Sequence, residues 1–326
     1  MQIERATLPP PPGLIASLAA GFDSVANSIT VIALPVLFDL FLWFGPHLRL
    51  QEFLQPTIDA LPRLYSGMSS STNLQLVQQL WSDFITRFNL FTGLRTFPVG
   101  ISSLMTVELP MVTPLGKPFT FDTSSLLTLL GWGLLVLLLG WLTGALYFHW
   151  VSKVALKFEG RPLGKSISQT LVLSIIWLTV LFVAILPVMM LISVVSLVSA
   201  GLGQFVLILV GLLALWLLIP VYFSAHGIFT FQLNAVSAIL NSLRMVRYTL
   251  PATGLFLLML FLISQGLRFL WTTPSADSWW TLVGILGHAF VSTALLAASF
   301  IYYRNVNEWL KVVFEKLRIQ KNTVKA

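Results

Sequence analysis

The stretch that decides the fold runs from Leu126 to Trp150 and reads LLTLLGWGLLVLLLGWLTGALYFHW. It contains no aspartate, glutamate, lysine or arginine, and an apolar run of more than about 18 residues can cross a bilayer as one helix. The loop that follows it holds four basic residues against one acidic residue: Lys153, Lys157, Arg161 and Lys165 against Glu159. Basic residues concentrate in short cytoplasmic loops. The stretch therefore predicts a transmembrane helix with Trp150 at its cytoplasmic end and Ser124 at its outer end.

The composition supports the same class for the whole chain. Of the 326 residues, 56% are apolar and 10% are charged, whereas about 25% of residues are charged in a typical globular domain. A β-barrel would show short alternating segments instead of long apolar runs. The net charge of +7 comes from residues at the ends of these runs, which is typical of orientation signals and contacts with anionic headgroups. We therefore expect an all-α integral membrane protein that binds no nucleic acid. Cysteine is absent, which excludes disulfides and thiolate sites.

Five further apolar segments can be threaded from the first: 28–45, 168–199, 204–226, 251–271 and a last one from Trp280 to Tyr303. Together they predict a six-transmembrane helix bundle with both termini on the cytoplasmic side. The Ala-Gly-Leu-Gly sequence at 200–203 predicts a tight turn between the third and fourth spans. Pro35 is expected to kink the first span because it removes a backbone donor.

Amphipathic helices are predicted beside the spans at 13–27 and 228–250, and the basic tail 304–326 has the same character. The first of these could instead be the frayed start of span one. A fainter version of the pattern near 167–171 suggests a threefold repeat of juxtamembrane helix, outward span, turn and returning span. Chance similarity among apolar helices is the alternative.

Residues 46–122 form the one long polar segment, and the direction of the second span places this segment outside as an extracytoplasmic insertion. A weaker helix, broken by Pro56 and Pro62, precedes its clearest element, and an extended chain with a turn at 114–117 follows. The segment predicts a small cap over the bundle. The alternative is an interfacial helix with loose flanks.

The clearest element of that insertion is an amphipathic helix over 73–91. Trp81, Phe84 and Phe88 lie in its apolar stripe at three- and four-residue spacing. Large apolar side chains facing water would make an exposed patch. We therefore expect the stripe to lie against other protein or the outer leaflet.

Three ionisable residues fall within the predicted spans, all in the outer half of the bilayer: Asp39, Arg268 and His288. Such residues are costly in a membrane and usually face the bundle interior or water. They could form a polar site for a substrate or a proton. Alternatively, an Asp39–Arg268 ion pair locks two helices, with His288 a hydrogen-bonded interior residue, or Arg268 reaches the outer headgroups. We expect Asp39 to face the bundle within reach of Arg268 or His288.

The remaining patterns predict no enzyme and no cofactor. The sequence has no zinc-binding His-Glu-x-x-His helix, phosphate-cradling loop or nucleotide fingerprint. His149 and His226 lie at one interface and could share a metal ion, but isolated interfacial histidines are commoner, so no metal site is predicted. Gly140 and Gly144 form a G-x-x-x-G motif that allows another helix to approach closely.

The segment 238–247 reads AILNSLRMVR and leads directly into a span. With six spans and interfacial helices before the odd-numbered ones, the chain resembles a loose group of bacterial membrane proteins. This group includes the membrane domain attached to glycerophosphoryl diester phosphodiesterases. The resemblance covers spans three to six, while 46–122 departs from it, and no phosphodiesterase domain is present from which catalytic residues could be carried over. It implies an accessory role in lipid or envelope processes at the bacterial cytoplasmic membrane.

Two functions are compatible with these patterns. The first is a non-enzymatic scaffold or accessory subunit whose protein partner binds 46–122 or the tail. The second is a transporter of a small molecule or lipid that uses the outer-half polar residues and proline-kinked helices around a cavity. A water-accessible cavity reaching Asp39 would favour the transporter, and a dry, packed bundle would favour the scaffold.

Overall fold

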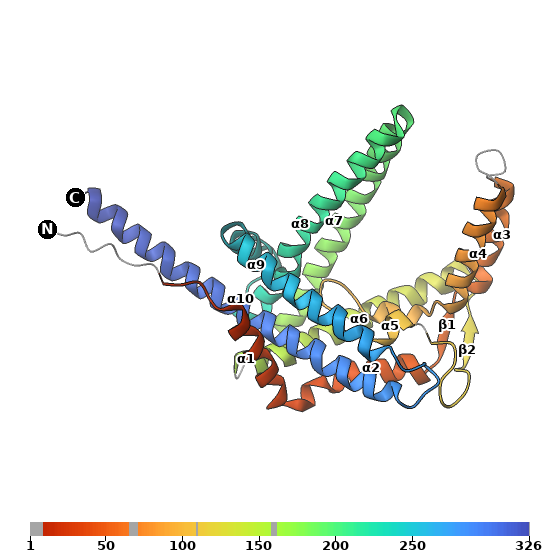
Figure 1. The fold of residues 1–326 in the computed structure, drawn as a ribbon, viewed down its shortest axis with the longest axis horizontal. Coiled ribbons are helices and arrows are strands. Elements are labelled where there is room, and N and C mark those ends of the chain that lie inside the picture. Colours follow the sequence, from red (N-terminus) through yellow and green to blue (C-terminus); the bar gives the residue numbers. More distant parts are fainter. Residues whose placement is uncertain (1–8, 65–70, 109, 158–161, 326) are drawn as a thin grey trace. The chain divides into compact units, whose positions relative to one another are not determined.

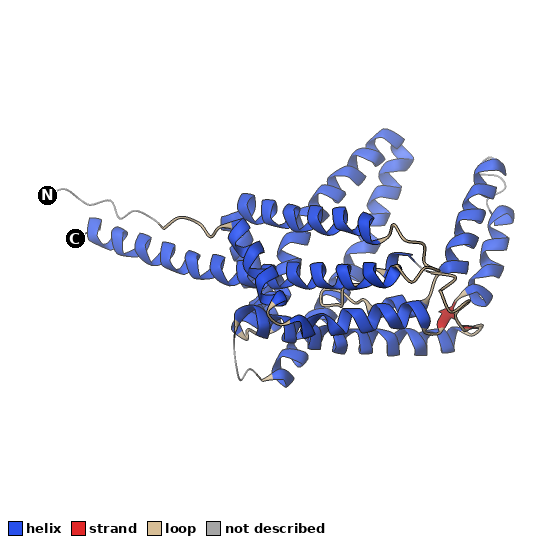
Figure 2. Ribbon diagram, turned by 60° about the horizontal axis from the view of Figure 1, so that its bottom comes forward, coloured by secondary structure: helices blue, strands red, loops and turns tan. Residues whose placement is uncertain are grey.

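The structure is a computed structural model that describes residues 9–64, 71–108, 110–157 and 162–325. Helices dominate these residues, and one pair of short strands interrupts them (Figures 1 and 2). The chain forms two compact units. Unit 1 comprises residues 1–31, 148–264 and 293–326, and unit 2 comprises residues 32–147 and 265–292.

Five described helices are long and apolar enough to cross a membrane: α6 (Leu126–Leu156), α7 (Leu163–Val198), α8 (Ala200–Phe231), α9 (Ala235–Trp271) and α10 (Thr281–Lys325). A sixth span is possible where α1 (Leu14–Ala26) is followed, across a break, by the helical residues Ile29–Phe44. The shortest of the five has 31 residues, or about 46 Å at 1.5 Å per residue, against a hydrocarbon core of about 30 Å. The all-α membrane class is therefore confirmed. The protein is a multi-span helical membrane protein.

In unit 1, α1 is a separate helix packed on protein. It ends at Ala26, and the short 3₁₀ helix η1 (Ile29–Ile32) follows it. A Cβ added to Gly21 would lie 2.5 Å from the Cβ of Ala298 on α10, so the two backbones touch. Because α1 and Ile29–Phe44 pass the length and composition test for a span only together, across a bend of 93°, the juxtamembrane helix and the start of span one both stay predictions.

The α7–α8 hairpin turns more tightly than the sequence predicts. Ser199 alone separates the two helices, and the expected turn residues 200–203 are the first residues of α8. A Cβ on Gly203 would lie 2.0 Å from Ser196 Oγ. This glycine therefore permits close helix approach and does not form a turn. Figure 1 shows the two helices side by side in green, and no residue in the apolar window of α7 is buried, as lipid-facing helices require.

The structure agrees with one further predicted helix boundary in unit 1 and lacks another. Helix α9 has a non-helical residue at Thr249, just before Pro251, where the juxtamembrane helix was expected to give way to a span. By contrast, α10 runs unbroken from the span through the basic tail. The tail lies partly on protein, since Val306, Leu310 and Val313 are buried.

In unit 2, the N-terminal part of the long insertion is a helical hairpin. The elements are α2 (Ala33–Phe44), β1 (His47–Arg49), α3 (Gln51–Leu64) and α4 (Ser71–Arg87). Helix α3 runs through Pro56 and Pro62, so the predicted breaks there are wrong. Pro35 lies in the first turn of α2, where a missing N–H costs nothing, and does not kink the helix.

The rest of the insertion returns to its starting point. The 3₁₀ helix η2 (Leu90–Leu94) and the short α5 (Met105–Glu108) precede β2 (Thr120–Asp122). Strand β2 pairs in parallel with β1, in the register His47 to Thr120. The turn predicted at 114–117 is present one residue earlier, where Thr113 and Gly116 exchange backbone hydrogen bonds.

The α3–α4 hairpin runs across the direction of α6 in both ribbon views (Figures 1 and 2). Ile58 and Ile85 are buried, while Leu80, Trp81 and Phe84 keep 60%, 50% and 47% of their surface exposed. Phe88, the third aromatic residue of the predicted stripe, is half-buried, so the described residues of the chain cover the stripe only in part.

Candidate functional site

Part of the insertion re-enters the bundle beside α6. We call residues 90–108 the re-entrant segment. A Cβ added to Gly140 would lie 2.6 Å from the backbone oxygen of Leu94, and one added to Gly144 would lie 2.9 Å from that of Val99. Gly140 is 14 residues from Leu126, or about 21 Å along the helix. These residues therefore lie beside the middle of α6.

The glycine motif in α6 allows the backbone of this segment to approach the helix closely. Sequence reasoning expected another helix to approach Gly140 and Gly144, whereas the structure places the end of the 3₁₀ helix η2 at Gly140 and irregular backbone at Gly144. Irregular backbone at membrane depth is tolerated only where protein buries it or water solvates it. Val99, Ile101 and Leu104 are buried, so the second half of the segment is packed as protein interior, whereas Arg95 and Phe97 are exposed. The insertion consequently does not lie wholly beyond the span ends.

Asp39 on α2 holds this segment in place. Its carboxylate accepts hydrogen bonds from Ser103 Oγ, from the backbone N–H of Leu104 at 3.0 Å and from that of Met105 at 3.1 Å. Ser103 Oγ in turn accepts the N–H of Thr106 at 3.1 Å. Asp39 has 0% exposure. It faces the interior as expected, and its described partners are groups of the re-entrant segment.

His288 on α10 contacts the neighbouring position of the same segment. Its Nε2 lies 3.2 Å from Ser102 Oγ, and its side chain is 7% exposed. Asp39 and His288 are therefore brought to one segment through Ser103 and Ser102. This is the hydrogen-bonded interior histidine of the structural alternative.

Arg268 does not pair with Asp39. Within the described part of the chain it forms no ion pair within 4.0 Å. Arg95 of the re-entrant segment instead lies near enough for its charge to interact with both Asp39 and Arg268. Arg95 Nη1 also donates to Thr106 Oγ1 at 3.3 Å.

Arg95 is the residue that sequence reasoning missed. It was not singled out, and it falls within 46–122, which was predicted to be an extracytoplasmic insertion. The available signal was that Arg95 is the one charged residue between Leu90 and Met105 in an otherwise uncharged stretch. An isolated charge in such a stretch is the pattern of an intramembrane ionisable residue.

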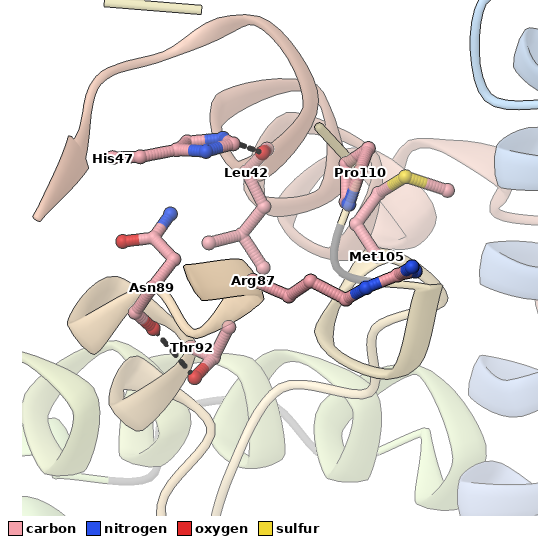
Figure 3. Close-up of a pocket in the computed structure, with 7 residues that line it drawn as sticks. All are labelled: Leu42, His47, Arg87, Asn89, Thr92, Met105 and Pro110. Carbon is pink, nitrogen blue, oxygen red and sulfur yellow. Dashed lines mark hydrogen bonds between the residues drawn. The ribbon is translucent and has the colours of Figure 1, made fainter. Parts of the chain in front are cut away.

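A narrow gap beside the contact between Asp39 and the re-entrant segment is closed to water. Leu42, His47, Arg87, Asn89, Thr92, Met105 and Pro110 line it, and the space between them does not admit a water molecule (Figure 3).

Two polar side chains of this gap, His47 and Asn89, form hydrogen bonds with backbone groups. Figure 3 shows the His47 ring directed at the Leu42 carbonyl oxygen, 3.3 Å away. Asn89 Oδ1 accepts the N–H groups of Leu48 and Phe91, each at 3.1 Å. Burial lowers the pKa of His47, with the charge of Arg49 adding to the effect and the Leu42 carbonyl opposing it.

Unit 1 has its own buried hydrogen bonds between helices. His226 Nε2 lies 2.7 Å from Ser299 Oγ, which joins α8 to α10. Asn241 Nδ2 donates to Tyr303 Oη at 2.6 Å and to Asn307 Oδ1 at 2.9 Å, which joins α9 to α10. Such bonds fix helix packing in membranes. In the described residues, no three His, Asp or Glu side chains gather to hold a metal ion.

Comparison with protein-family models, curated proteins and solved structures finds no match to this chain. Its function must therefore be argued from its own contacts.

Proposed function

We propose that this protein is a non-enzymatic scaffold or accessory subunit of the bacterial cytoplasmic membrane, in a lipid- or envelope-related process, with both termini cytoplasmic and no cofactor. The observation that carries the proposal is the enclosure of Asp39. A carboxylate with 0% exposure and three hydrogen-bond donors is committed to holding the re-entrant segment. A proton or substrate site must instead exchange with water. The role of the Asp39 carboxylate is therefore structural: it holds the re-entrant segment in place.

The face offered to a protein partner is the exposed stripe of α4. Leu76, Leu80, Trp81 and Phe84 keep between 47% and 60% of their surface exposed. Their spacing places them on one side of the helix, and Gln75 projects from the other side. Aromatic and aliphatic clusters of this kind supply most of the binding energy at protein interfaces.

A photo-crosslinking residue placed at Leu80 tests this proposal in intact cells, with Gln75 as the matched control position on the same helix. We expect irradiation to join Leu80, and not Gln75, to one membrane or envelope protein. Replacing Trp81 with alanine should reduce that adduct. An adduct with lipid alone would contradict the proposal that α4 binds a protein partner. It would favour the alternative in which α4 lies on the outer leaflet.

One observation favours the transporter as a second candidate. Arg95 and Arg268 are neighbouring cations in unit 2, and Arg95 keeps an exposed surface. Discontinuous segments carrying charge form the substrate sites of many transporters. An anionic substrate would suit two arginines. Uptake of an organic anion into proteoliposomes that the Arg95→Gln variant loses, while remaining folded, would support transport over the scaffold.

A further inference from the structure

A second feature of the chain, independent of the re-entrant segment, is an open groove in unit 1. It has a volume of about 590 Å³ and lies between the end of α1, the end of α6 and the middle of α10. Ligand pockets commonly measure about 300–1,000 Å³. The groove is therefore large enough for the headgroup and glycerol region of a lipid.

The charges on the groove wall suit a single negative charge. Among the described residues, Lys157 and Arg304 line it together with Asp23, so this described lining carries one net positive charge. In the described part of the chain none of the three forms an ion pair. A phosphodiester carries one negative charge, whereas a phosphate monoester carries nearly two at neutral pH. Asp23 would repel the second charge, so the lining favours the diester.

The rest of the lining joins a polar rim to an apolar wall. Ser24 and Asn27 supply a hydroxyl and an amide, while Ala155 and Ile301 supply apolar surface. The groove lies where α6 leads into the basic loop, which marks the cytoplasmic boundary of the membrane. A molecule with an anionic head and an apolar body at that boundary is a phospholipid.

We propose that this groove binds one anionic glycerophospholipid through its phosphodiester, with the phosphate between Lys157 and Arg304 and the glycerol end against Ala155 and Ile301. Lysine and arginine are the usual partners of phosphate in proteins. Lys157 and Arg304 thereby hold the phosphate at one defined place, whereas a basic surface attracts anionic lipids without fixing their position.

Native mass spectrometry of the full-length protein in detergent tests the proposal with defined lipids. Phosphatidylglycerol should be retained as one adduct and phosphatidylcholine should not. Each basic residue near a membrane surface strengthens binding of anionic lipid about fivefold. The double variant Lys157→Gln/Arg304→Gln should therefore lose about 25-fold in affinity for phosphatidylglycerol.

Two variants separate the groove from general electrostatics. Lys153→Gln removes the same charge one turn away on α6, from a residue outside the lining, and should leave retention unchanged. Ser24→Leu keeps every charge but fills the groove and should also abolish the adduct. Circular dichroism and melting of each variant establish that it is folded.

Three results would overturn the proposal. Equal losses in Lys153→Gln and in the single variant Lys157→Gln would show a diffuse basic surface. Unchanged retention in folded Ser24→Leu would place the lipid elsewhere. Binding of free glycerol 3-phosphate or of phosphatidic acid as tight as that of phosphatidylglycerol would show that the site takes a phosphate monoester. Failure here leaves the α4 crosslinking result, and hence the scaffold proposal, unaffected.

Discussion

Replacing Asp39 with asparagine should destabilise the protein even though the two side chains have the same shape. The carboxylate accepts from Ser103 Oγ and Met105 N–H on one oxygen and from Leu104 N–H on the other. An amide has a single acceptor oxygen. If that oxygen takes the position that serves Ser103 and Met105, its NH₂ group faces the Leu104 N–H, and two donors meet.

The expected cost follows from these bonds. A buried donor without a partner costs about 1–3 kcal/mol, and each remaining bond loses about 1 kcal/mol when its acceptor is no longer charged. Relief from burying a carboxylate offsets part of this. The net loss should be about 2–4 kcal/mol, or an apparent melting temperature lower by about 3–8 °C.

Thermal unfolding in a fixed detergent, followed by tryptophan fluorescence, measures this effect. Asp83→Asn is the matched control, because Asp83 is exposed on α4 and should change stability by less than about 0.5 kcal/mol. Ser103→Ala removes one of the three donors, and its loss of stability should lie between those of Asp39→Asn and Asp83→Asn. If Asp39→Asn melts with the wild type, the carboxylate is not the ionised anchor of the re-entrant segment.

Three further outcomes are expected. Gly140→Leu should displace the re-entrant segment and cost about 1–3 kcal/mol of stability in thermal melts, whereas Gly131→Leu on the same helix, where an added Cβ meets nothing within 4 Å, should be tolerated. Burial holds the pKa of His47 below its ordinary 6.5, so the folded state takes up a proton less readily than the unfolded state and stability falls as pH drops below about 6.5. His47→Gln should therefore lose less stability than wild type between pH 7 and pH 5, and equal losses would contradict this. Cysteines introduced at Gln79 and Lys165 should react with an impermeant maleimide from opposite sides of the membrane, and labelling from the same side would overturn the predicted topology.

Apolar run length predicted most of the long helices, whereas proline position was right at one boundary and wrong at others. Span five was predicted to begin at Pro251, and the non-helical Thr249 lies two residues before it, which agrees with the rule that proline interrupts a helix. The same rule failed for Pro56 and Pro62, where α3 packs against α4 and continues through both prolines. Tertiary packing, which single-residue preferences do not contain, decides such cases.

The candidate site was predicted in part. The cost of a lone carboxylate in a membrane predicted that Asp39 faces inward, and it does. Its partner could not be predicted, because Ser103 is 64 residues away in the chain and two of the three donors are backbone groups that any sequence would supply. Likewise the motif at Gly140 and Gly144 signals close approach but does not say what approaches.

The position of the re-entrant segment beside α6 is the central claim, and a pair of spin-label distances tests it most directly. The chain has no native cysteine, so labels can be placed at Phe97 together with either Leu142 or Leu127 on α6, all of which are exposed. The two α6 positions are about 22 Å apart along the helix. The structure predicts that Phe97 is nearer to Leu142. A segment wholly outside the bundle would place Phe97 nearer to Leu127, and that order of distances would contradict the account.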